Sequence, residues 1–241
     1  IIDLKYRDFA FGFIAEDYRA NKNYEQFVNI VKRINNTDTK IDLILSCVKK
    51  IEQKEIASDL LNEAYTILRP YPVNNIEYEE LDKIYDFISD IVEQYARIGN
   101  YKHSLQITEL VNDKESKLSL MIKVVRQLNQ KDVAADLLNQ IYAMLRQIKT
   151  NEIKDHFLPM IAEEYSIIGD YEKAFEIFGK LSQKTEVGVS RYLKSILTPA
   201  KNNIDSTFFK NARKCVESRK KSESKDYWAY LIIKEVSQTV D

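Results

Sequence analysis

The chain has 241 residues, of which 44% are hydrophobic, so it is long enough to bury a substantial core. Five glycines and four prolines are few for a β-sandwich or barrel, whose tight turns need both residues, and we therefore expect a helical protein. The 36 basic and 37 acidic residues leave a net charge of -1, which gives no reason to expect nucleic acid or an anionic membrane as the main partner.

Neither a membrane span nor a secretion signal is indicated. The longest apolar runs, 9–15 and 227–233, are far shorter than the about 20 residues that cross a bilayer. The N-terminal "IIDLKYRD" lacks the cationic start and apolar centre of a signal peptide, although the missing initiator Met indicates a fragment or a processed chain. Cys47 and Cys215 show no metal-ligand spacing, so we expect reduced, buried thiols. These features predict no membrane insertion and a cytoplasmic location.

Helical hairpins are predicted in sequence along the first part of the chain. The segment "YRANKNYEQFVNI" at 18–30 joins two helices, and a second hairpin follows at about 39–69. Pro70 and Pro72 end that hairpin, and an acidic run, Glu77, Glu79, Glu80 and Asp82, begins the next helix. Apolar residues of the second hairpin recur at helical spacing and predict a buried face: Ala57, Leu60, Leu61, Ala64 and Leu68.

The middle of the chain repeats this pattern. Positions 24–69 align with 101–146 without a gap, and 16 of the 46 pairs are identical. The repeated buried face is Ala134, Leu137, Leu138, Ile141 and Leu145. Part of the pattern occurs a third time, since "YARIGNYKHSLQI" at 95–107 matches "YSIIGDYEKAFEI" at 165–177. Such self-similarity predicts stacked repeats, each of which buries its apolar face against a neighbour.

Short turns and caps are predicted from the glycines and the remaining prolines. Gly99 and Gly169 each follow one helix and precede another, so each is expected to take the left-handed conformation of a tight hairpin turn. Asp155 is expected to cap a helix whose first turn contains His156 and Pro159.

The last part of the chain matches the repeat less well. Gly188 and Pro199 interrupt the apolar pattern, and "ESRKKSESK" at 217–225 is a polar, basic connector. The basic cluster that begins at Arg213 suits either a solvated linker or an electrostatic contact. A final helix is expected to cover the open end of the array, with one face formed by Trp228, Leu231, Ile232 and Val236.

These hairpins resemble the tetratricopeptide repeat. The resemblance rests on "MIAEEYSIIGDYEKAFEIFGKL" at 160–181, and it extends over about 10–181. The chain departs from the family's pattern in the absence of the first-helix tryptophan and of a regular final proline, and in insertions beyond the period of about 34 residues. The positions that match in this segment are Leu158, Ala162, Tyr165, Gly169, Asp170, Tyr171, Ala174 and Phe178.

The resemblance implies an all-α fold: a right-handed α-α superhelix (solenoid) of antiparallel hairpins with about 12–13 helices. We expect a single domain over 1–241, with repeat units at about 1–75, 76–150 and 151–241. The third unit is diverged and carries the capping helix.

Motifs of catalysis, cofactor binding or metal binding are not found. His103 and His156 are the only histidines, and neither belongs to an HExxH or similar arrangement. No GxSxG, Walker or GxGxxG motif occurs. We therefore expect no enzyme activity, no catalytic residue, no cofactor and no metal. The recurring tyrosines, among them Tyr95 and Tyr165, are expected to pack within hairpins while their hydroxyls reach a polar partner.

The resemblance implies that the first helix of each hairpin lines a concave groove for a protein or peptide partner. The positions expected to face it alternate in charge, which suits a partner of mixed charge, or they are simply the polar sides of amphipathic helices. An alternative is a regulatory sensor of a small peptide or ligand in the same groove. A nucleic-acid binder is not expected because the composition is balanced, and homo-oligomerisation remains open. The expected groove residues are Glu16, Arg19, Ser46, Lys49, Glu93, Arg97, Lys123, Arg126 and Glu163.

Overall fold

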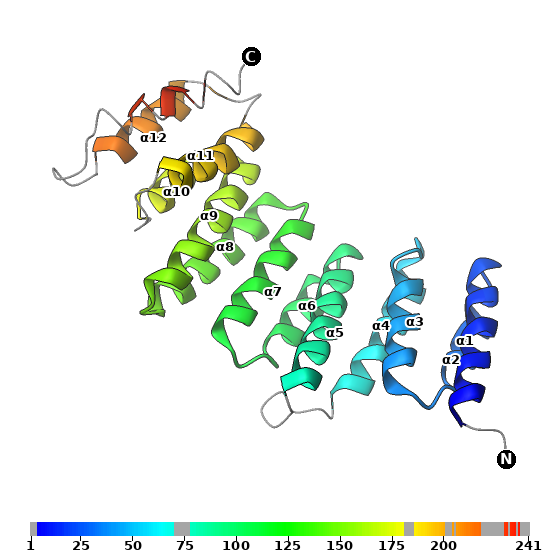
Figure 1. The fold of residues 1–241 in the computed structure, drawn as a ribbon. Coiled ribbons are helices and arrows are strands. Elements are labelled where there is room, and N and C mark those ends of the chain that lie inside the picture. The colour runs from blue at the N-terminus through cyan, green and yellow to red at the C-terminus, as the bar shows by residue number, and fades with distance from the viewer. Residues whose placement is uncertain are drawn as a thin grey trace. The chain divides into compact units, whose positions relative to one another are not determined.

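The computed structural model describes residues 4–69, 78–180, 186–200 and 206–217, with residues 204, 229, 230, 232–234 and 236. This part of the chain is helical and contains no strand, which confirms the all-α prediction (Figure 1). Contacts divide the chain into two compact units, Ile1–Gln127 and Leu128–Asp241. Their boundary falls inside the predicted repeat unit 76–150, so compact units and sequence repeats divide the chain differently.

The described part of the first unit consists of seven helices in two layers. Helices α1, α3, α5 and α7 contact one another in that order, and α2, α4 and α6 each bridge two successive members of this row (Figure 1). We refer to α1, α3, α5 and α7 as the front layer. The helices are α1 (Leu4–Ala20), α2 (Tyr24–Val31), α3 (Thr37–Val48), α4 (Lys54–Leu68), α5 (Tyr78–Arg97), α6 (Tyr101–Thr108) and α7 (Lys114–Gln127).

The second unit is built around one central helix. Helix α9 packs against α8, α10 and α11, while α12 packs on α10. The helices are α8 (Lys131–Gln147), α9 (Asn151–Ile168), α10 (Tyr171–Phe178), α11 (Glu186–Ala200) and α12 (Ser206–Glu217).

The repeated apolar stripes form the core, as predicted. Leu61 in α4 and Leu138 in α8 are fully buried, and their stripe neighbours are buried as well. Cys47 and Cys215 are buried, as predicted, and neither forms a disulfide within the described residues. None of the described helices is long and apolar enough to cross a membrane.

The hairpin turns confirm the prediction for both glycines. Gly99 and Gly169 have φ of 90°, and the next residue in each case caps the following helix through its side chain. The first copy of the turn places Lys22 at the same position, with φ of 56°. A lysine therefore holds a left-handed conformation that glycine takes in the other two copies.

The prediction for the start of α9 is wrong. The helix begins at Asn151 with Thr150 as its N-cap, so Asp155 is not the cap, and His156 and Pro159 lie beyond the first turn. Gly188 and Pro199, which interrupt the apolar pattern of the repeat, both lie within α11. In α9 the burial of residues on both sides of Pro159 favours a continuous helix, because tertiary packing outweighs local propensity.

The C-terminal predictions are tested only in part. The basic cluster begins inside α12, where Arg213 pairs with Glu217 and Lys214 with Glu172. The remainder of the connector, together with Pro70, Pro72, Trp228 and Leu231, lies outside the described residues. Ile232 and Val236 are buried.

Candidate functional site

The front layer of the first unit carries eight of the nine predicted groove residues. Glu16 and Arg19 lie on α1, Ser46 on α3 and Lys49 directly after it. The other four lie on the last two helices of the layer: Glu93 and Arg97 on α5, Lys123 and Arg126 on α7. Glu163 lies on α9 in the second unit, so it is not part of this site.

The α1 end of the layer has an internal ion pair. Arg19 Nε donates to Glu16 Oε2 at 2.7 Å, and this hydrogen bond raises the pKa of Arg19 above its ordinary value. The Ser46 hydroxyl lies 3.5 Å from the other oxygen of the Glu16 carboxylate. Helices α1 and α3 are therefore linked at the positions that the repeat predicts to face a partner.

Further contacts connect α3 with α5. Lys49 Nζ lies 2.7 Å from Asp90 Oδ2. Arg97 Nη2 donates to the Val48 carbonyl at 2.7 Å, while its Nε donates to Gln94 Oε1 at 2.8 Å. A cation at the last carbonyl of α3 also complements the negative end of that helix. Arg97 thus fastens two helices in addition to presenting charge.

Side chains of α5 and α7 are linked in the same way. Lys123 Nζ lies 2.5 Å from Ser89 Oγ, and the Tyr85 hydroxyl donates to the Ser116 carbonyl at 3.3 Å. Burial raises the pKa of Tyr85. Arg126 has interactions of its own. Most predicted groove residues therefore lie on the polar sides of their helices and also hold neighbouring helices together.

Glu93 is the exception among the charged groove residues. Its side chain is half-buried and forms no hydrogen bond or ion pair within the described part of the chain. A carboxylate without a cationic partner on a protein surface is able to accept one from a ligand.

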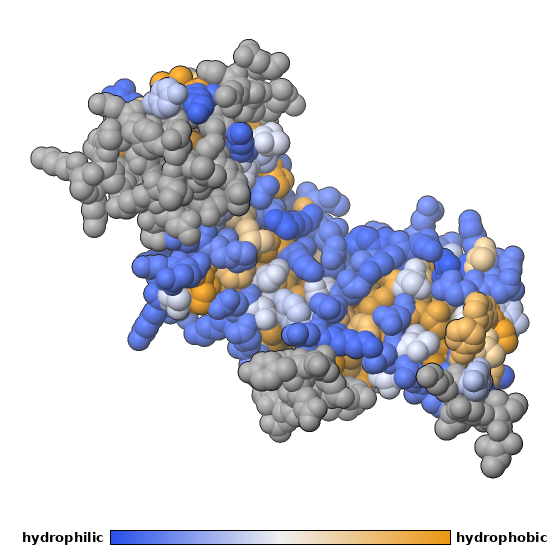
Figure 2. Space-filling view, in the orientation of Figure 1, coloured by the Kyte–Doolittle hydropathy of each residue, from blue (hydrophilic) through white to orange (hydrophobic). Residues whose placement is uncertain are grey.

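An apolar depression of about 200 Å³ lies beside this polar row, between α1 and α3. Phe9 and Phe13 form one wall in edge-to-face contact, with ring centroids 4.7 Å apart, and Leu43 lies opposite. The Phe9 side chain is 65% exposed. Figure 2 shows hydrophobic residues breaking the hydrophilic surface over the N-terminal helices.

Neither phenylalanine is among the groove residues predicted from the sequence. The signal lies in the run 9–15, where apolar residues follow one another around α1 instead of recurring on one face. Such a helix must expose some of them unless it is covered on all sides.

Two tyrosine–asparagine hydrogen bonds repeat between hairpins. The Tyr95 hydroxyl donates to Asn62 Oδ1 at 2.7 Å, and the Tyr165 hydroxyl donates to Asn139 Oδ1 at 2.9 Å. Burial raises the pKa of both tyrosines. The pairs occupy equivalent positions in the repeat, so the predicted polar partner is confirmed for these two tyrosines, whereas Tyr18 has no acceptor among the described residues. These bonds join α4 to α5 and α8 to α9.

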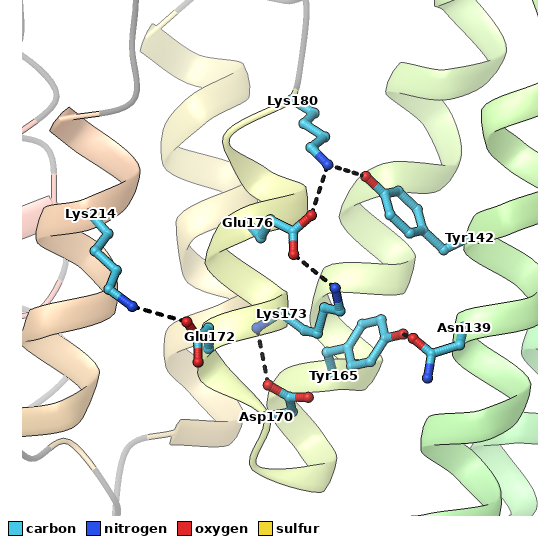
Figure 3. A network of polar contacts seen from close by, with 9 residues as sticks. All are labelled: Asn139, Tyr142, Tyr165, Asp170, Glu172, Lys173, Glu176, Lys180 and Lys214. Atoms are coloured by element: carbon cyan, nitrogen blue, oxygen red, sulfur yellow. Dashed lines mark hydrogen bonds and ion pairs between the residues drawn. The ribbon is translucent and has the colours of Figure 1, made fainter.

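A second depression, of about 430 Å³, lies between α10 and α12. Figure 3 shows the charges around it already paired: Lys214 Nζ lies 2.9 Å from Glu172, and Glu176 lies 2.8 Å from both Lys173 and Lys180. Hydrogen bonds from these lysines lower the pKa of both glutamates. Because its cations and carboxylates satisfy one another, this depression is a weaker ligand site than the front layer.

The two histidines lie in aromatic surroundings. His103 packs against the rings of Tyr95 and Tyr65, with centroids 4.6 and 5.8 Å away, and His156 contacts Phe157. Among the described residues, no cluster of His, Cys, Asp and Glu is arranged to hold a metal ion.

Comparisons with known proteins add little to this geometry. No protein-family model matches the chain, and no curated protein matches it. A solved structure described as "Computational Design of Self-Assembling Cyclic Protein Homooligomers" aligns with 98% of this chain and 94% of its own, at 10% identity and a TM-score of 0.20. A TM-score this low does not indicate a shared fold, so neither architecture nor assembly follows from it.

Proposed function

We propose that the chain is a non-catalytic, tetratricopeptide-like scaffold that binds a protein or peptide segment across α1, α3 and α5. The observation that carries this proposal is the apolar depression with the exposed Phe9, which lies in the same helix layer as the unpaired Glu93. The first feature suits an apolar anchor, and the second suits a basic side chain. Protein interfaces commonly combine these two elements.

Spacing sharpens the proposal. Packed helices lie about 10 Å apart, so a segment that reaches from α1 across α3 to α5 spans about 20 Å. An extended chain covers that distance in about six residues. The partner is therefore a segment with an apolar residue and a Lys or Arg about six positions apart.

The same proposal includes the finer architecture that the repeat implies. Successive hairpins of a right-handed α-α superhelix would extend the front layer into a concave groove, and a cytoplasmic location fits the free thiols. A short regulatory peptide and a segment of a larger protein would use the same contacts. Peptide length therefore distinguishes the sensor from the scaffold.

Selection of binders from a random peptide library tests the proposal. The immobilised chain should enrich peptides that contain the apolar and basic residues at the stated spacing. Phe9→Ser and Glu93→Arg should each weaken binding of the selected peptides at least about tenfold, because each removes one anchor. Ile167→Ser, which changes an exposed apolar residue of α9, is the matched control. Equal binding by Phe9→Ser, Glu93→Arg and the wild type would exclude the front layer as the site.

A further inference from the structure

One side of α1 is apolar and uncovered. We call this side the end face and define it as Tyr6, Ala10, Phe13, Ile14 and Asp17, which lie together because they recur every three or four residues. The side chains of Tyr6, Phe13 and Ile14 are 72%, 64% and 42% exposed. This degree of exposure on one helix side is typical of an interaction surface.

The equivalent side of α5 contacts the preceding hairpin. The register that aligns 24–69 with 101–146, continued toward the N-terminus, carries the end face onto positions 83, 87, 90, 91 and 94. Lys83 Nζ lies 2.5 Å from Asp38 in α3. Asp90 pairs with Lys49, which directly follows α3. Phe87 is buried, as are positions 91 and 94, and α4 packs on α5.

The side of α9 that is equivalent to the end face of α1 carries residues of closely similar chemistry. The register that matches 95–107 with 165–177 carries these positions onto Ile153, Phe157, Met160, Ile161 and Glu164, which are four apolar residues and an acid. The end face of α1 likewise has four apolar residues and an acid. Phe157, Ile161 and Glu164 are buried, and α8 packs on α9. In α9, therefore, this set of apolar residues and an acid is packed under a neighbouring helix.

The covering helices share two polar features. Each carries an asparagine that accepts the tyrosine hydrogen bond, Asn62 in α4 and Asn139 in α8. Tyr18 occupies the equivalent tyrosine position in α1, and the described part of the chain gives its hydroxyl no acceptor. Helix α1 thus exposes an apolar side and a tyrosine hydroxyl, and helices such as α4 and α8 cover the one and accept a hydrogen bond from the other.

The second feature concerns charge. Each covering helix begins with a lysine, and Lys54 Nζ and Lys131 Nζ lie 3.8 Å from the points where a Cβ on Gly99 and Gly169 would stand. These cations lie at the C-terminal ends of α5 and α9, where positive charge is favourable. After α1 the glycine position holds Lys22 instead. A covering helix with a lysine there would meet a like charge, whereas an acid would be attracted.

We propose that the end face of α1 binds an amphipathic helix of a partner protein. This helix has the Ala-x-x-Leu-Leu-Asn stripe of α4 and α8, but it carries an acidic residue where they carry Lys54 and Lys131. Its leucines cover Ala10 and Ile14, whose equivalents in α5 and α9 are buried. Its asparagine accepts a hydrogen bond from the Tyr18 hydroxyl, and its acid pairs with Lys22. The acid distinguishes it from the corresponding helices of a second copy of this chain. The end face shares Phe13 with the depression of the proposed groove, whereas Ala10, Ile14 and Tyr18 do not line that depression and therefore test the end face separately.

The test uses the full chain and two labelled peptides with the sequence of residues 130–147, one native and one with Lys131→Glu. Fluorescence anisotropy should show saturable binding, with the Lys131→Glu peptide about fivefold tighter at low salt and the preference reduced at high salt. Lys22→Gly should abolish the preference. Ile14→Asp and Ala10→Asp should each weaken binding about tenfold or more, because a buried carboxylate would lack a partner. Tyr18→Phe should weaken it about fivefold through loss of one hydrogen bond.

Ile167→Asp is the control for a new surface charge and should bind both peptides as the wild type does. Circular dichroism confirms that each variant folds, and Ala10→Asp tests the same face if Ile14→Asp does not fold. The proposal is overturned if neither peptide saturates the wild type by about 1 mM, which is negligible affinity, or if Ile14→Asp and Ala10→Asp bind normally. Sedimentation of the wild-type chain as a dimer that Ile14→Asp dissociates would also overturn it, because a second copy would then cover the face.

Discussion

At the residue scale, the three copies of the hairpin turn differ in strain. Lys22 holds a φ of 56°, whereas Gly99 and Gly169 take the left-handed conformation without a Cβ. A left-handed residue other than glycine costs about 1 to 2 kcal/mol, part of which glycine returns through the entropy of the unfolded chain. We expect Lys22→Gly to increase the free energy of unfolding by about 0.5 to 1 kcal/mol, measured by urea denaturation.

The reverse change at the second turn provides the control. Gly99→Lys introduces the same strain and brings a second cation to Lys54, whose Nζ lies 3.8 Å from the new Cβ position. It should destabilise the chain by about 1 to 2 kcal/mol. Opposite signs for the two substitutions are expected, and stabilisation by Gly99→Lys would contradict the assignment of strain to this turn position.

The tyrosine–asparagine pairs predict a second pattern of stabilities. Tyr95→Phe and Tyr165→Phe each remove a hydrogen bond between hairpins and should cost about 0.5 to 1.5 kcal/mol. Tyr18→Phe should change stability little in the absence of a partner protein. A double-mutant cycle of Tyr95→Phe with Asn62→Ala isolates the pair energy. Additive losses in that cycle would mean that the bond contributes nothing.

Cys47 makes stability depend on alkaline pH. Burial raises the pKa of its thiol to about 12, above the ordinary value of 9.0. Because the unfolded thiol ionises first, its contribution to stability is fully present below pH 9 and is lost as pH rises from there toward 12. Stability should fall by up to about 1.4 kcal/mol per pH unit for this group. Cys47→Ala should reduce the slope, whereas Ser58→Ala, a substitution of similar size, should not.

Residue-level contacts mark the limit of sequence reasoning. The repeat register placed eight predicted groove residues on one helix layer, because equivalent positions of equivalent helices face the same way. The hydrogen-bond partners of these residues were not predictable. Arg97 donates to the Val48 carbonyl of another hairpin, and Lys123 contacts Ser89 on the neighbouring helix. Such contacts depend on how far one helix slides past the next, which the hydrophobic period does not specify.

At the element scale, α4 and α8 test whether the repeated stripe holds the hairpins together. Leu61→Ala and Leu138→Ala each empty a fully buried site, and each should cost about 2 to 5 kcal/mol. Glu63→Ala and Gln140→Ala, on the same helices but outside the buried stripe, should cost less than about 0.5 kcal/mol. Denaturant midpoints for the four variants check the pattern. If the leucine variant and the polar variant of the same helix unfold at equal midpoints, the inward face of that helix is misassigned.

Element boundaries were predicted well where glycine determines them and poorly where packing does. The turns at Gly99 and Gly169 are as predicted because the left-handed conformation is a local property. Pro159 was placed in a first turn for an equally local reason, yet α9 continues around it. Its neighbours Phe157 and Ile161 are buried, and the free energy of that burial is not visible in a local sequence window.

At the scale of the whole molecule, two divisions of the chain coexist. The sequence repeats in units whose matching helices begin at Tyr24, Tyr101 and Tyr171, while contacts gather into Ile1–Gln127 and Leu128–Asp241. Nearest-neighbour stabilisation in repeat arrays allows separate parts to open at different free energies. The compact units, and not the repeat units, are therefore expected to behave as the cooperative segments.

Hydrogen exchange in the native state distinguishes these divisions. Leu61→Ala lies in the first unit and should reduce amide protection in α3, α4 and α5 more than in α9 and α10. Leu138→Ala occupies the equivalent repeat position but lies in the second unit, so it should reduce protection mainly in α8, α9 and α10. The informative helix is α7, which shares a predicted repeat unit with α8 but a compact unit with α5. Protection of α7 should fall with Leu61→Ala and persist with Leu138→Ala. Loss of α7 protection together with α8 in Leu138→Ala would mean that the sequence repeat, rather than the compact unit, is the cooperative segment.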